Sequence, residues 1–177
     1  MNPQKLNAQQ IAEMAPSLHA GDRILLSGTV YTARDAAHKR IMQCIEANTP
    51  LPFDLCGAVI YYAGPTPAPH GLAVGSCGPT TAGRMDPYTP KLLALGLAGM
   101  IGKGERNSQV VEAIQKHHAV YLCAIGGAGA LACHCVKSCE EVAFLELGCE
   151  SVKRLVIEDF PLIVGIDCHG GNLFQSA

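Results

Sequence analysis

Apolar residues recur along the chain in two spacings, which predict strands and helices. Short apolar runs between Gly, Pro or polar residues indicate strands, and apolar residues at helical spacing indicate amphipathic helices. The expected helices cover residues 6–15, 33–46, 87–95, 107–118 and 130–136. The expected strands cover residues 23–31, 57–62, 71–74, 97–101, 119–125, 141–146, 152–157 and 162–167.

The order of these elements predicts the fold class and the domain count. Strands alternate with helices early and cluster late, which favours an α/β fold with a mainly parallel sheet and a second, partly antiparallel sheet. A length of 177 residues fits one domain over residues 1–177. We expect residues 1–20 to be a less ordered N-terminal segment.

The residues between Val74 and Asp86 combine a glycine loop with hydroxyl and guanidinium groups. Three glycines and Pro79 surround the adjacent Thr80 and Thr81, and Arg84 follows. An expected strand precedes this loop and an expected helix follows it, with Thr89 as cap and Pro90 in the first turn. Free backbone N–H groups, hydroxyls and a guanidinium together suit an anion. The alternative is a connection whose threonines cap the helix and whose arginine is solvated.

Two more cations follow expected strands. Arg34 stands at a strand-to-helix junction, where α/β folds commonly bind ligands. Lys103 lies between two glycines at a strand end, although the P-loop spacing is absent and an exposed turn lysine is the alternative. His38 lies one helical turn after Arg34. The pattern favours a hydrogen-bonded helix histidine over a ligand at His38.

Composition narrows the choice of partners and location. Hydrophobic residues make up 49% of the chain and can fill a core, while 16% charged residues is low. Either a partner covers part of the surface or a sheet is covered on both faces. A formal net charge of −2 without Lys/Arg runs argues against nucleic acid. No apolar run reaches the roughly 20 residues that span a bilayer. With a polar N-terminal stretch, we expect a cytoplasmic protein.

The nine cysteines do not predict a metal site in this chain. Cys133, Cys135 and Cys139 lack the spacing of structural zinc sites and common ferredoxins. On a helix, Cys133 and Cys135 would point to nearly opposite sides. We therefore expect reduced, partly buried thiols.

Three separated segments carry a family resemblance. Residues 27–40 read SGTVYTARDAAHKR, residues 75–86 read GSCGPTTAGRMD, and residues 101–104 read IGKG. Together they resemble the iron–sulfur-dependent (class I) fumarate hydratases, in the part that forms the C-terminal domain or a separate beta subunit. Residues 126–131, 156–161 and 166–167 fit as well, so the resemblance extends from about Gly21 onward. Tartrate dehydratase beta subunits belong to the same family.

The resemblance implies a fold and a site. The fold would be a three-layer β/β/α domain of the swivelling type. Thr80 matches the proposed catalytic base and Thr81 a neighbour that touches substrate. The residues that match the cations gripping the two carboxylates of malate or fumarate are Arg34, Arg84 and Lys103. Cys77 and Ala82 stand where alanine and serine are expected, and Cys77 places a thiol near the implied site.

The resemblance also implies what lies outside this chain. A [4Fe–4S] cluster and the proposed acid would belong to an alpha subunit, in an α2β2 heterotetramer. The first hypothesis is therefore a hydro-lyase beta subunit that is active only with its partner and converts (S)-malate reversibly to fumarate, a reaction of the tricarboxylic acid cycle. The second is a subunit of an L-tartrate or related hydroxy-acid dehydratase. The third is a non-catalytic anion-binding module.

Overall fold

The computed structural model describes residues 2–125 and 129–175 and contains a seven-stranded mixed sheet within them. Its strands are β1 (Gln4–Asn7), β2 (Arg23–Thr32), β3 (Val59–Tyr61), β4 (Gly99–Gly102), β5 (Val120–Cys123), β6 (Val136–Ala143) and β7 (Val152–Ile166). The α-helices are α1 (Ile11–Met14), α2 (Asp35–Glu46), α3 (Thr89–Ala94), α4 (Ser108–Lys116) and α5 (Gly129–Cys135). The 3₁₀ helices are η1 (Ala8–Gln10), η2 (Ala15–Ser17), η3 (Ala82–Met85) and η4 (Leu145–Glu150). Among the described residues, no helix has both the length and the apolar character needed to cross a bilayer.

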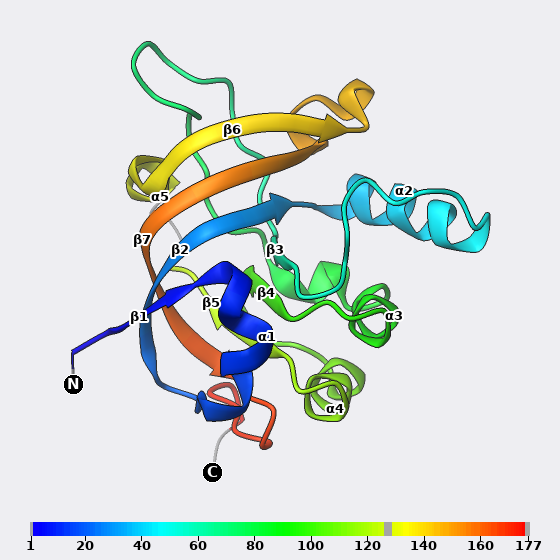
Figure 1. Ribbon diagram of the computed structural model, residues 1–177, viewed down its shortest axis with the longest axis vertical. Helices are drawn as coiled ribbons and strands as arrows, with labels where there is room; N and C mark the ends of the chain where they lie inside the picture. The colour runs from blue at the N-terminus through cyan, green and yellow to red at the C-terminus, as the bar shows by residue number, and fades with distance from the viewer. Residues whose placement is uncertain (1, 126–128, 176–177) are drawn as a thin grey trace.

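Strand β7 joins the parallel and antiparallel parts of the sheet. Neighbouring strands from β2 through β5 pair in parallel, and β7 pairs antiparallel with β5, β2 and β6. Because β7 pairs with both β5 and β2, five strands close into a ring (Figure 1). The predicted α/β class is confirmed. The two sheets expected from the sequence are one hydrogen-bonded sheet in the structure, since β7 belongs to both parts.

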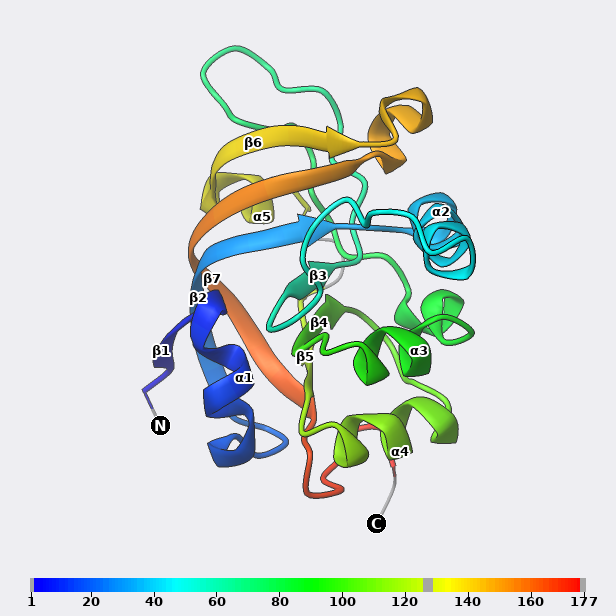
Figure 2. The same cartoon turned by 45° about the vertical axis from the view of Figure 1, so that its right-hand side comes forward.

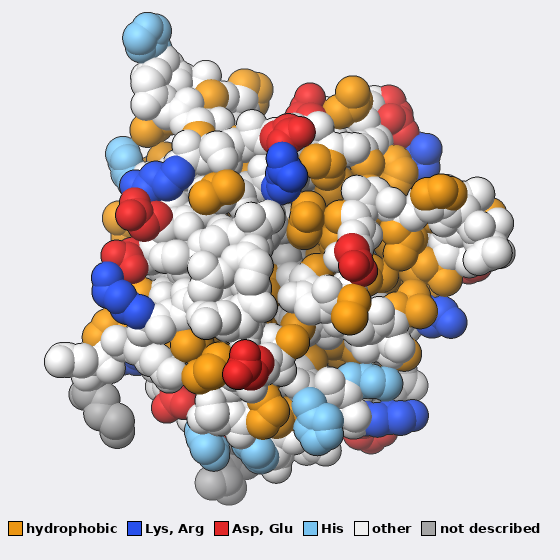
Figure 3. Space-filling view, viewed as in Figure 1, with side chains coloured by type: hydrophobic (Ala, Val, Ile, Leu, Met, Phe, Trp, Pro, Cys, Tyr) orange, Lys and Arg blue, Asp and Glu red, His pale blue; other side chains and the backbone are white. Residues whose placement is uncertain are grey.

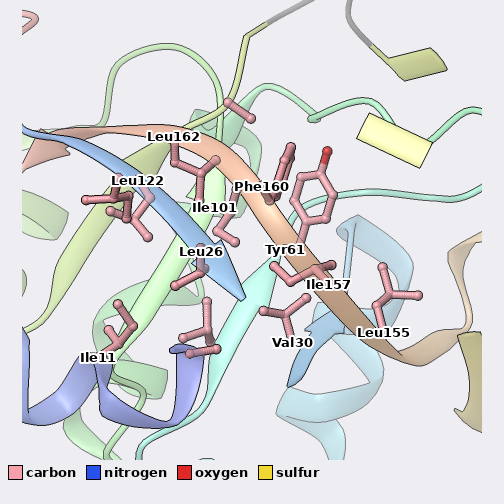
Figure 4. Packing of buried hydrophobic residues seen from close by; sticks show 14 of the residues in the cluster. Ile11, Leu26, Val30, Tyr61, Ile101, Leu122, Leu155, Ile157, Phe160 and Leu162 are labelled. Carbon is pink, nitrogen blue, oxygen red and sulfur yellow. The ribbon is translucent and has the colours of Figure 1, made fainter. Parts of the chain in front are cut away.

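Two buried clusters lie on opposite faces of the parallel strands. Val59 and Tyr61 of β3 belong to the cluster inside the ring, and Ile60 between them belongs to the cluster under the helices. Figure 4 shows the ring interior, into which Ile11 of α1 also packs. Helices α2, α3 and α4 cover the other face (Figure 2). Burial on both faces explains why these strands read as continuous apolar runs.

The surface reflects this layering. On the face in Figure 3, apolar side chains gather on the half beside α2, while charged side chains lie mostly along the margins. The low charged fraction is therefore explained at least in part by a sheet that is covered on both faces.

The predicted strands 152–157 and 162–167 are one continuous strand, β7. The apolar pattern predicts a connection at residues 158–161, which include Pro161. The register with β2 shifts between Leu26 and Gly28, and Asp159 adopts a positive φ of 48° there. The Asp159 N–H donates to the Ser27 hydroxyl at 2.9 Å. This β-bulge absorbs the irregular residues without ending the strand.

The strand predicted for residues 71–74 is wrong. These residues lie in a loop that pairs with itself, because the Gly75 N–H donates to the Thr66 carbonyl at 2.9 Å and the Thr66 N–H donates to the Ser76 carbonyl at 3.0 Å. Gly71 has a φ of +85°, which a strand does not use. Val74 is buried all the same. Burial of one side chain explains the apolar pattern without a strand.

Other elements begin or end several residues away from their predicted boundaries. The strand predicted at 141–146 is β6, which begins at Val136 and is followed by η4. Helix α3 starts at Thr89, so Tyr88 occupies the N-cap position and Thr89 does not cap. The hydroxyl of Thr89 instead donates to the Met85 carbonyl at 2.9 Å. The helix predicted over residues 130–136 is α5. Of the segment 126–131 that carries part of the family resemblance, residues 126–128 lie outside the described residues.

The N-terminal residues form regular elements. β1 pairs with β2 through Gln4–Asn7, and the side chain of Asn7 caps η1. Ile11 and Ala15 are fully buried in the ring interior. The predicted helix over residues 6–15 is thus divided into a strand end and short helical turns. The single-domain assignment and the lower order of residues 1–20 stay predictions.

Candidate active site

The carboxyl ends of β2, β3 and β4 bring the predicted site residues to one edge of the sheet. Lys103 directly follows β4, and Tyr62 directly follows β3. The Thr80 N–H donates to the Tyr62 carbonyl at 2.6 Å, and the Lys103 N–H donates to the Thr80 carbonyl at 3.3 Å. Thr81 and Lys103 form a parallel bridge. The glycine loop therefore lies beside the end of β4, at the edge where α/β sheets commonly bind ligands.

Arg84 reaches the β2–α2 junction through an ion pair. Its Nε donates to Oδ1 of Asp35 at 2.9 Å, and its Nη2 lies 2.8 Å from Oδ2. Asp35 is the first residue of α2 and follows Arg34 directly. The side chain of Arg84 remains 51% exposed. This pair fastens η3 to the segment that carries Arg34, across 49 residues of sequence.

Arg34 lies between a loop and the β6–β7 connection. Its Nε is 3.2 Å from Oε1 of Glu150, an ion pair outside hydrogen-bond geometry. Gly64 packs so closely that an added Cβ would lie 3.0 Å from Arg34 Nη1 and 3.2 Å from the Cys149 carbonyl oxygen. The glycine therefore leaves room for the guanidinium, because real Cβ contacts are rarely this short.

A buried ion pair between Arg106 and Asp86 anchors the end of the glycine loop. Arg106 donates from Nε to Oδ1 of Asp86 at 2.6 Å and from Nη2 to the Thr89 hydroxyl at 2.7 Å. Its guanidinium carbon lies 5.4 Å from the ring centre of Tyr62 and 5.0 Å from that of Tyr121. Sequence reasoning missed Arg106. The only local signal was that Asp86 closes the GSCGPTTAGRMD motif two residues after Arg84.

His38 is buried beneath the site and is neutral. Burial lowers its pKa to about 4. Its Nδ1 lies 2.8 Å from the Arg34 carbonyl oxygen, and because a carbonyl only accepts, Nδ1 carries the proton. Its ring packs against Tyr62 and Tyr88. His38 is thus the hydrogen-bonded helix histidine that the sequence pattern favoured.

Cys77 is placed differently from what its sequence position suggested. Its side chain is fully buried in the cluster inside the ring. Burial raises the pKa of the thiol to about 12, so the thiol is protonated and poorly nucleophilic. The Tyr61 hydroxyl donates to the Cys77 carbonyl at 2.5 Å and holds this part of the loop on the sheet.

The other cysteines are free thiols. Helix α5 ends at Cys135, and Cys139 lies in β6, so the cysteines of this segment are divided between a helix and a strand. Within residues 2–125 and 129–175, no group of three or more His, Cys, Asp or Glu side chains is arranged to hold a metal ion. An iron–sulfur cluster therefore has no ligand set among the described residues.

The edge carries an excess of positive charge and is open to solvent. Arg34, Arg84 and Lys103 face two carboxylates, Asp35 and Glu150, in this region. Thr81, Arg84 and Lys103 are exposed, and Thr80 and Arg34 are half-buried. An edge of this kind suits a small anion with more than one negative group. The roles of the individual residues stay predictions.

Fold and site thus define an α/β domain with a cationic edge at the carboxyl ends of its parallel strands. The chain belongs to the Fumarase C-terminus family, whose model matches residues 2–177. Two fumarate hydratases are similar to it. The Escherichia coli aerobic class I fumarate hydratase is 43% identical over 86% of this chain and 28% of its own length. Fumarate hydratase 2 of Leishmania major is 42% identical over 88% of this chain and 28% of its own length.

The chain is also similar to a relative most of whose length it covers. A Methanocaldococcus jannaschii protein proposed to be an L(+)-tartrate dehydratase subunit beta is 38% identical over 89% of this chain and 84% of its own length. The chain thus spans little more than a quarter of the two fumarate hydratases and most of the dehydratase subunit. Fumarate hydratases and tartrate dehydratases are hydro-lyases, so these relatives identify the family as one of hydro-lyases.

Proposed function

We propose that this chain is the beta subunit of a two-subunit fumarate hydratase that converts (S)-malate reversibly to fumarate. The observation that carries the proposal is the gathering of Arg34, Arg84 and Lys103 around Thr80 and Thr81 at one open edge. The match over 84% of a beta-subunit relative supports a separate subunit. The open edge, and the lack of a ligand set among the described residues, support a partner alpha subunit. We place the two subunits in an α2β2 assembly.

The cations of this chain bind and orient the dicarboxylate. Arginine offers five N–H donors in a planar fork that matches a carboxylate, and Lys103 adds a compact charge. Arg34 and Arg84 come from two different segments of the chain. They can therefore hold the two carboxylates of one C4 substrate apart in a defined orientation, which contributes to catalysis by positioning.

Thr80 accepts the proton in this proposal. Malate dehydration breaks a C–H bond beside one carboxylate and the C–O bond of the next carbon, and the electron pair of the C–H bond forms the double bond. Thr80 acts as its alkoxide, which the nearby cations stabilise because they lower the pKa of the hydroxyl. The alkoxide oxygen takes the proton and becomes a hydroxyl, which returns the proton to solvent after the product leaves. A [4Fe–4S] cluster held by the alpha subunit would supply a Lewis acid for the departing hydroxide.

The test is the assembled enzyme. The chain is produced with its alpha subunit under anaerobic conditions and assayed on (S)-malate, fumarate and L-tartrate, with Thr80→Ala and Thr80→Ser variants. We expect activity on malate that is lost in Thr80→Ala and partly retained in Thr80→Ser, because serine keeps a hydroxyl. Wild-type kcat in Thr80→Ala with full cluster loading would exclude Thr80 as the base and leave Lys103 as the next candidate.

The tartrate relative supports a second candidate function. A dehydratase acting on L-tartrate would use the same grip on two carboxylates and differ in the second hydroxyl of its substrate. A kcat/KM for tartrate that exceeds the value for malate would favour this candidate. No turnover of any hydroxy acid by the assembled complex would favour an anion-binding module instead.

A further inference from the structure

The Arg84 guanidinium is held along one side by Asp35. Nε donates to Oδ1 at 2.9 Å, and Nη2 lies 2.8 Å from Oδ2. This side-on contact leaves Nη1 and the outer N–H of Nη2 directed away from Asp35. Within the described part of the chain, Nη1 of Arg84 has no hydrogen-bond acceptor. The Asp35 carboxylate thus fixes the guanidinium along the edge formed by Nε and Nη2. The N–H groups at the far end, on Nη1 and Nη2, stay available, and they are called the end-on donors of Arg84.

We propose that Asp35 is a positioning residue that aims the end-on donors of Arg84 at a substrate carboxylate. The inference rests on the proposed function, in which Arg84 binds that carboxylate. Asp35 acts through Arg84 and has no contact of its own with the reacting atoms.

Asp35 is suited to this task because its backbone is anchored. It is the first residue of the 12-residue helix α2, where an ionised carboxylate is favoured by the helix dipole. The preceding carbonyl, that of Arg34, accepts from the His38 N–H at 2.8 Å and lies 2.8 Å from His38 Nδ1. The Asp35 side chain is 29% exposed against 51% for Arg84. The anchored, more buried partner therefore orients the longer and more exposed one.

Arg34 is held differently from Arg84. Its Nε lies 3.2 Å from Oε1 of Glu150 but outside hydrogen-bond geometry, so Glu150 supplies a nearby charge without fixing the guanidinium through Nε. Three cations and two carboxylates leave a net charge of +1 for a dianionic substrate. Asp35 thereby lowers the total positive charge and in return gives Arg84 a single orientation.

Two substitutions at Asp35 separate orientation from charge. Asp35→Asn removes the charge but keeps an oxygen that can accept from Arg84 Nε, whereas Asp35→Ala removes both. We expect Asp35→Ala to lower kcat/KM for malate about tenfold to a hundredfold, because small misplacements near the chemistry have large effects. The kcat/KM of Asp35→Asn should lie within about threefold of the wild-type value. The inhibition constant of succinate, an unreactive C4 dicarboxylate, should rise in Asp35→Ala and stay near wild type in Asp35→Asn.

Arg84→Ala and the double variant Asp35→Ala/Arg84→Ala complete a cycle in the assembled enzyme. If Asp35 acts through Arg84, the double variant matches Arg84→Ala in kcat, KM and succinate inhibition. Glu146→Ala is the matched control, because Glu146 pairs with Arg40 of α2, the helix that Asp35 begins, at exposed side chains and makes no ion pair with Arg34 or Arg84 among the described residues. This control should keep wild-type kinetics.

The outcomes distinguish the positioning role from the proposed function. If Arg84→Ala is strongly impaired and Asp35→Ala is not, the positioning role is wrong and the proposed function stands. If the inhibition constant of succinate falls equally in both Asp35 variants, only the charge of Asp35 matters, and the positioning role is wrong as well. If Arg84→Ala itself leaves kinetics and succinate inhibition unchanged, Arg84 does not bind the substrate and both proposals fail.

Discussion

Arg106 donates from Nε to Oδ1 of Asp86 at 2.6 Å, in a pair whose side chains are 0% and 7% exposed. Oδ2 of Asp86 also accepts from the Asn107 N–H at 2.8 Å. Asp86 follows η3, which carries Arg84, and Asn107 caps α4. The pair therefore ties the segment with the candidate site residues to the helical layer.

We predict that Arg106→Met lowers the free energy of unfolding by about 3–5 kcal/mol, because it leaves Asp86 as an uncompensated buried charge. Urea unfolding of the purified chain measures this change. Lys5→Met is the control, since Lys5 pairs with Asp159 at side-chain exposures of 72% and 47%. Exposed pairs contribute at most about 1 kcal/mol. Equal effects of the two substitutions would contradict the prediction.

The buried His38 predicts an acid-labile fold. Its folded pKa of about 4 lies below the value of 6.5 that is usual for histidine, so the unfolded chain binds the proton more readily. The stability contributed by neutral His38 is thus complete above about pH 6.5 and is lost progressively as the pH falls toward about 4, by roughly 3 kcal/mol in total.

A variant isolates the contribution of this histidine. Asn at position 38 can donate to the Arg34 carbonyl but does not titrate. Unfolding free energies measured between pH 7 and 4 should fall more steeply for the wild type than for His38→Asn. Parallel pH curves for the two proteins would show that His38 is not the titrating group.

Arg84→Ala and Thr80→Ala should impair the assembled enzyme in different ways. Arg84 is proposed to hold a carboxylate in ground and transition states alike, so its loss should raise KM strongly. A charge-assisted hydrogen bond contributes about 1.5–3 kcal/mol, roughly ten- to over a hundredfold in kcat/KM. Thr80→Ala should lower kcat far more than it raises KM. Steady-state kinetics with matched cluster loading measures both, and identical profiles for the two variants would argue against separate roles.

The isolated chain should not retain an iron–sulfur cluster. Its described residues contain no convergent ligand set, and burial raises the pKa values of the Cys135 and Cys139 thiols, which disfavours thiolate ligands. Anaerobic reconstitution followed by iron and sulfide analysis is the measurement. A stoichiometric cluster that is lost on substitution of Cys133, Cys135 or Cys139 would refute the prediction.

Local sequence determined several elements because their signals are short-range. The strand-to-helix junction at Arg34 and a helix over residues 107–118 were predicted from apolar spacing, and the structure confirms both elements, with α4 beginning one residue later at Ser108. The Asn107 side chain accepts from the Val110 N–H, as a cap does. The family resemblance was likewise readable from short motifs, and the family match confirms it.

Tertiary structure decided what depends on distant segments. The continuation of β7 through Pro161 requires β2 beside it and a bulge at Asp159, and neither is visible in the apolar pattern. The partners of Arg84 and Arg34 are Asp35 and Glu150, which lie far away along the chain. By itself the sequence determined the residue types of the site, because its motifs are local. Only folding decided which carboxylate faces which cation, because parallel strands bring their carboxyl ends together irrespective of sequence distance.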